Sequence, residues 1–110
     1  MDKSLPMAMP AALVAALRMS FRRLDADAQS LLTMAALLPE PFHSAQLQLL
    51  LGAGIEDDHL ALLDRLEWQC WLVADARGYA FRARAVRRMI AEEMLTPGQR
   101  QRLLHRIAAS

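Results

Sequence analysis

A short strand–turn–strand pattern interrupts an otherwise helical sequence between residues 71 and 82. Two largely apolar segments, residues 71–75 and residues 79–82, flank a turn that contains Gly78. Short segments of this kind on either side of a glycine-containing turn are typical of a β-hairpin. This feature constrains the fold more than any other, because any architecture for this chain must place a two-stranded hairpin between helices.

Apolar residues recur at helical spacing on both sides of this hairpin. They predict helices over about residues 10–24, 25–38, 44–51, 57–68, 84–95 and 96–109. Pro39 and Pro41 stop the second helix, Gly52 ends the third, and Thr96 with Pro97 begins the last. Three helices followed by a hairpin predict a mainly α fold: a winged helix-turn-helix with about six helices and one short two-stranded wing at about residues 71–82.

The chain has 110 residues, which indicates one domain. We expect a flexible lead-in at residues 1–9 and a single winged-helix domain at residues 10–110. Residues 5–17 are apolar but interrupted by Pro6 and Pro10, and no other segment approaches the roughly 20 apolar residues of a membrane span. The sequence therefore predicts a cytoplasmic domain without membrane contact.

Cys70 is the single cysteine, so no internal disulfide forms, and it lies in an apolar segment. We expect a buried free thiol there, with Trp68 and Trp71 as core residues on either side. The three histidines are far apart and have no cysteine or carboxylate at ligand spacing. We therefore expect no metal site, and no combination of nucleophile, base and orienting group predicts an enzyme.

The charge is unevenly distributed although the net charge is only +1. Residues 41–70 carry five carboxylates against Arg65 alone, whereas residues 71–110 carry eight arginines against three carboxylates. The helix that would read DNA in a winged helix, residues 57–68, holds four of those carboxylates: Asp57, Asp58, Asp64 and Glu67. Carboxylates repel the phosphates that line a DNA groove, so this helix is poorly suited to reading DNA.

The basic residues predict a surface for a protein partner. Arg84, Arg87 and Arg88 are spaced by three and four residues and would share a helix face, as would Arg102 and Arg106 one helix later. The candidate interaction residues are Arg82, Arg84, Arg87, Arg88, Arg102 and Arg106. The candidate residues of the wing are Arg77, Gly78 and Tyr79. The complementary acidic patch would lie on an adjacent domain, another protein or a second copy of the chain. Pairing within the chain, such as Arg88 with Glu92, is the alternative.

Several spaced segments resemble the winged-helix part of STAND-type signalling ATPases, bacterial regulators related to the NB-ARC switches of plants and animals. The resemblance covers about residues 10–109. It is carried by residues 16–24, Leu31-Leu32, Ala35-Ala36, Leu38-Pro39, Phe42, residues 62–66, residues 79–82, Val86-Arg87 and residues 100–108.

The resemblance implies a regulatory module that follows a nucleotide-binding domain and packs against other domains. In that family a histidine after the second wing strand often approaches the nucleotide, but Ala83 occupies this position here. The chain also lacks the glycine-rich Walker loop with its lysine, so it cannot hydrolyse ATP alone and we expect no cofactor. We predict a non-catalytic protein-interaction domain. The alternative is the DNA-binding domain of a transcriptional regulator.

Overall fold

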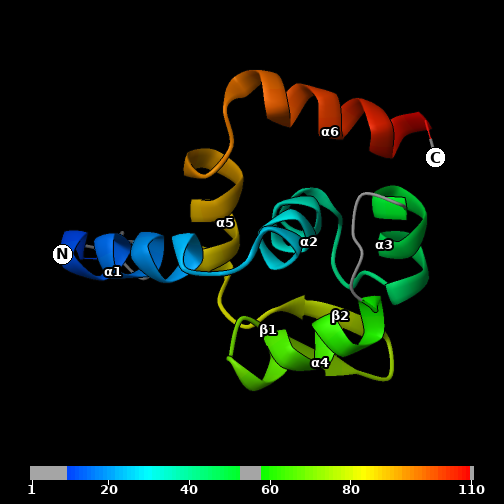
Figure 1. Ribbon diagram of the computed structural model, residues 1–110, viewed down its shortest axis with the longest axis horizontal. Coiled ribbons are helices and arrows are strands. Elements are labelled where there is room, and N and C mark those ends of the chain that lie inside the picture. Colours follow the sequence, from blue (N-terminus) through cyan, green and yellow to red (C-terminus); the bar gives the residue numbers. More distant parts are fainter. Residues whose placement is uncertain (1–9, 53–57, 110) are drawn as a thin grey trace, which may run out of the picture.

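An apolar helix, α2 (Ala26–Leu37), lies at the centre of the fold (Figure 1). The computed structural model describes residues 10–52 and 58–109, so the predicted lead-in at residues 1–9 lies outside the described residues. Helices α3, α5 and α6 all contact α2. A helix surrounded in this way must be apolar on most of its circumference, and its buried residues are Ala28, Leu31, Leu32, Met34, Ala35 and Ala36.

Six helices and one antiparallel hairpin make up the described part of the chain. Their order is α1 (Ala11–Arg22), α2 (Ala26–Leu37), α3 (Ser44–Leu51), α4 (His59–Trp68), β1 (Leu72–Asp75), β2 (Gly78–Phe81), α5 (Arg84–Glu93) and α6 (Pro97–Ala109). This mainly α architecture, with its hairpin between α4 and α5, confirms the predicted fold class and is compatible with a winged-helix layout. In Figure 1, α1 projects from one side of the body and α6 crosses one end. No helix in the described ranges has the length and apolarity needed to cross a bilayer.

The start of α6 confirms the predicted cap. Thr96 Oγ1 accepts a hydrogen bond from the Gln99 backbone N–H at 3.1 Å, and Gln99 Oε1 accepts one from the Thr96 backbone N–H at 2.9 Å. This reciprocal pair satisfies two backbone donors at a helix start that would otherwise be unpaired. It fixes where α6 departs from the end of α5.

The hairpin is attached to the helical body through Phe42, in the segment between α2 and α3. Strand β1 pairs with β2 in the register Leu72 to Phe81 and Asp75 to Gly78. On the other edge of β2, the Phe42 N–H donates to the Tyr79 carbonyl at 2.9 Å and the Tyr79 N–H donates to the Phe42 carbonyl at 2.8 Å. The Phe42 and Tyr79 rings also stack, with centroids 6.0 Å apart. The wing is therefore held on both edges of β2.

Only one of the two tryptophans belongs to the core. Trp71 is 8% exposed and meets Phe21 edge-on, with ring centroids 6.4 Å apart. Trp68 is 87% exposed and Cys70 is also exposed, so the predictions of a buried Trp68 and a buried thiol were wrong. Helix α4 ends at Trp68, and Cys70 takes a positive φ of 68° in the turn that follows. This reversal directs Trp71 inward and leaves Trp68 on the outer surface of α4.

Three arginines of the basic C-terminal part join helices to one another. Each donates to a backbone carbonyl at or near the C-terminal end of another helix. The donors and acceptors are Arg87 and Leu38 (2.8 Å), Arg100 and Ala91 (2.7 Å), and Arg106 and Leu50 (3.1 Å). Carbonyls in the last turn of a helix have no partner within it, and the helix dipole favours a cation at this end. These contacts connect α5 to α2, α6 to α5, and α6 to α3.

Replacing Gly78 with alanine should destabilise the fold. Gly78 has a φ of +140°, and an added Cβ would lie 2.5 Å from the Phe42 carbonyl oxygen. We expect Gly78→Ala to lower the free energy of unfolding by about 2–3 kcal/mol, measured by urea denaturation. The control is Gly98→Ala, whose Cβ would meet only the end of the Arg102 side chain at 3.5 Å. Equal stability of the two variants would contradict the close approach at Phe42.

Replacing Arg87 with methionine should also destabilise the fold, because the Leu38 carbonyl loses its charged donor while the aliphatic part of the side chain is kept. We expect a loss of about 1–3 kcal/mol in the free energy of unfolding. The matched control is Arg88→Met, which removes only an exposed pair with Glu92 and should change stability by about 0.5 kcal/mol or less. A neutral Arg87→Met variant would show that the Leu38 contact does not hold α5 in place.

Candidate protein-interaction site

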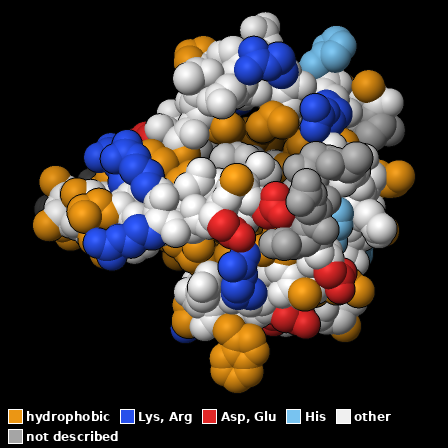
Figure 2. All heavy atoms as spheres, viewed as in Figure 1, with side chains coloured by type: hydrophobic (Ala, Val, Ile, Leu, Met, Phe, Trp, Pro, Cys, Tyr) orange, Lys and Arg blue, Asp and Glu red, His pale blue; other side chains and the backbone are white. Residues whose placement is uncertain are grey.

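The outer face of α4 exposes large apolar side chains. Leu60, Asp64 and Trp68 are spaced by four residues and lie on one face, opposite the buried Leu62, Leu63 and Leu66. Leu60 is 56% exposed and Trp68 is 87% exposed. Figure 2 shows acidic side chains over the region where Figure 1 places α4, with a large hydrophobic side chain protruding there. Exposed apolar groups next to charges are typical of a protein-binding surface.

This face of α4 is acidic as well as apolar. Arg65, the only arginine or lysine of α4, pairs with Asp25 at 3.0 Å. Burial raises the pKa of the Tyr79 phenol, and the negative charges of Glu67 and Asp64 raise it further. These two carboxylates therefore act on the wing as well, and the negative charge extends from α4 toward β2. Asp57, which the sequence placed in the same helix, lies outside the described residues.

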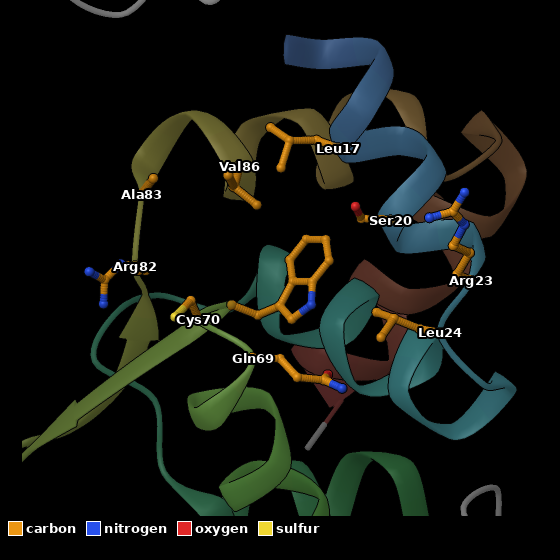
Figure 3. Close-up of a pocket in the computed structure, with 10 residues that line it drawn as sticks. Leu17, Ser20, Arg23, Leu24, Gln69, Cys70, Arg82, Ala83 and Val86 are labelled. Atoms are coloured by element: carbon orange, nitrogen blue, oxygen red, sulfur yellow. The ribbon is translucent and has the colours of Figure 1, made fainter.

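A pocket of about 700 Å³ opens beside the C-terminal end of α4. It lies between α1, the turn that joins α4 to β1, and the junction of β2 with α5 (Figure 3). Its lining consists of Leu17, Ser20, Arg23, Leu24, Gln69, Cys70, Trp71, Arg82, Ala83 and Val86. The volume and the largely apolar lining are in the range of pockets that bind drug-sized molecules or large side chains.

Two arginines give the pocket a positive rim. Figure 3 shows Arg23 and Arg82 at opposite ends of the pocket, with Leu17 and Val86 between them along one side. Both arginines are exposed, and neither guanidinium has a hydrogen-bond or ion-pair partner within residues 10–52 and 58–109. The pocket thus combines apolar walls with two exposed positive charges, which are opposite in sign to the carboxylates of α4.

The predicted arginines do not form one surface. Arg84 is exposed, but Arg87 is partly buried, since its guanidinium reaches the Leu38 carbonyl. Arg88 pairs with Glu92 at 3.3 Å, which is the alternative that the sequence left open. The predicted common face of Arg84, Arg87 and Arg88 was therefore wrong for Arg87, because α5 turns this residue toward α2.

The remaining predicted residues are also dispersed. Arg82 lies at the pocket rim, Arg102 is exposed on α6, and Arg106 binds the Leu50 carbonyl. In the wing, Gly78 and Tyr79 face the segment that contains Phe42. At the wing tip the Arg77 backbone N–H donates to Asp75 Oδ1 at 2.8 Å, and this bond is the main cause of a lowered pKa for the Asp75 carboxyl.

The sequence did contain a signal that Trp68 is exposed, but its apolar neighbours suggested burial instead. The spacing of Leu60, Asp64 and Trp68 places them on a face apart from the core leucines of α4.

The sequence contained no such signal for the pocket, because the pocket walls come from three parts of the chain that only the fold brings together. Ala83 also lines this pocket. Within the described ranges, no group of three or more His, Cys, Asp or Glu side chains could hold a metal ion.

Comparisons with known proteins identified no relative of this chain. No family model, no curated protein and no solved structure matches the chain.

Proposed function

We propose that this protein is a non-catalytic protein-interaction domain of the winged-helix type, with a regulatory docking role like that of the corresponding module in STAND-type signalling ATPases. The observation that carries the proposal is the outer face of α4, where Leu60 and Trp68 are exposed beside Asp64. Burying these two side chains against a partner removes a large apolar area from water, which is the main driving force of protein association.

The same face argues against reading DNA. A winged helix usually places this helix in the major groove, where base edges and phosphates surround it. Here the helix presents Asp64 and Trp68, and its one arginine, Arg65, is already paired with Asp25. Phosphate contacts by lysine and arginine supply most of the affinity of DNA-binding proteins. A protein surface with positive charge and apolar pockets is a better complement to this helix than a DNA groove.

Titration of a labelled DNA duplex tests the proposal. We expect no binding by fluorescence anisotropy at physiological salt, and at most weak binding at low salt through exposed arginines of α5. An Arg84→Glu/Arg88→Glu variant should remove this residual binding, since both side chains are exposed. Charge reversal at Arg87 is unsuitable, because it would disturb the contact with Leu38. Tight binding that survives physiological salt would overturn the proposal in favour of a DNA-binding domain.

The two tryptophans should differ sharply in their contribution to folding. We expect Trp71→Ala to lower the free energy of unfolding by about 3–5 kcal/mol, because it removes a buried ring. Trp68→Ala should change it by about 0.5 kcal/mol or less, because an exposed side chain contributes little to the isolated fold. Urea denaturation followed by circular dichroism measures both variants. A large loss for Trp68→Ala would mean that Trp68 serves stability rather than binding.

A further inference from the structure

The structure carries two complementary surfaces on one chain. We propose that they bind each other between two copies: the outer face of α4 of one copy inserts Trp68 into the pocket of the other copy, and the contact is made twice in a closed dimer. This inference rests on the proposed function, since it names the partner of the same α4 face.

The first support is charge complementarity. The carboxylates of Asp64 and Glu67 lie beside Trp68 near the C-terminal end of α4, whereas Arg23 and Arg82 lie at opposite ends of the pocket (Figure 3). With the indole in the pocket, the carboxylates come near guanidiniums that have no other partner among the described residues. Such pairing fixes the register of a complex and excludes partners of the wrong charge.

The second support is the match of size and polarity. A pocket of about 700 Å³ has room for an indole together with a second apolar side chain. Leu17, Leu24 and Val86 provide apolar walls. Tryptophans that enter such pockets are the residues that most often dominate the energy of protein interfaces. The most exposed aromatic side chain among the described residues, Trp68, is therefore matched in size and polarity to this pocket.

The third support is the position of the two surfaces. Trp68 directly precedes Gln69 and Cys70, which line the pocket, so the inserting side chain and the receiving pocket lie at the same end of the molecule. A twofold rotation about an axis at this end brings each Trp68 to the pocket of the other copy. Closed twofold dimers use the same surface on both subunits, and the association stops at two copies.

Sedimentation equilibrium of the intact chain, from low micromolar to near-millimolar concentration, tests the dimer. We expect a monomer–dimer equilibrium, and we expect Trp68→Ala to raise the dissociation constant at least about tenfold. The matched control is Leu49→Ala, which removes another highly exposed side chain, on α3, and should leave the equilibrium unchanged. A chain that stays monomeric throughout, or a dimer indifferent to Trp68→Ala, would overturn the inference.

A charge exchange tests the pairing itself. The variant Arg23→Glu/Arg82→Glu and the variant Asp64→Arg/Glu67→Arg should each dimerise at least about tenfold more weakly than the unaltered chain. Mixed together they should form a heterodimer, because each carries the surface that complements the other. Circular dichroism of each variant alone checks that it is folded. Folded variants that fail to associate on mixing would contradict the proposed contact.

Cys70 offers an independent probe, because it is the only cysteine, is exposed and lines the pocket. We expect alkylation of Cys70 by iodoacetamide to slow as the protein concentration rises, and to stay constant in the Trp68→Ala variant. Constant alkylation in the unaltered chain would place the dimer contact elsewhere and overturn the inference. The DNA titration tests the proposed function independently of the dimer. If the protein is a monomer that does not bind DNA, the dimer inference fails but the proposed protein-interaction function stands.

Discussion

The paired hydrogen bonds between Phe42 and Tyr79 are the contact on which the rest of the arrangement depends. They attach the wing to the segment between α2 and α3, and Gly78 makes the approach possible because a Cβ there would collide with the Phe42 carbonyl. Once β2 is held in this way, the turn after α4 and the start of α5 are held as well. The pocket exists only because these two segments are fixed opposite α1.

A second constraint concerns the arginines of the C-terminal part. Arg87, Arg100 and Arg106 bind backbone carbonyls at the ends of other helices, so much of the positive charge is used to assemble the fold. Charged hydrogen bonds to such carbonyls stabilise helix ends that cannot be satisfied within the helix. Among the arginines that stay exposed, Arg23 and Arg82 form a positive pocket rim, which is opposite in charge to the acidic, apolar face of α4. This division of the charge is the physical basis of the proposed dimer.

The secondary structure was largely predictable because its signals are local. Helical periodicity, Thr96 with Pro97, and the glycine turn at residue 78 each act within a few residues, and the hairpin appears within one residue of the predicted strands. The candidate site was predicted less well. Arg87 shares its spacing with exposed residues and still turns inward, and Trp68 shares an apolar neighbourhood with Trp71 and still lies outside. The spacing of residues along a helix shows which of them share a face, but it does not show whether that face packs against another helix.

The sequence by itself determined the helices, the hairpin and the acidic and basic parts of the chain, because these follow from local conformational preference and composition. Only the tertiary structure decided which arginines bind the carbonyls at helix ends, which tryptophan enters the core, and where the pocket opens. Each of those outcomes depends on contacts between segments far apart in sequence, such as Arg87 with Leu38 and α1 with the turn at Cys70. Their energies arise from burial and charge pairing, which exist only after the chain has packed.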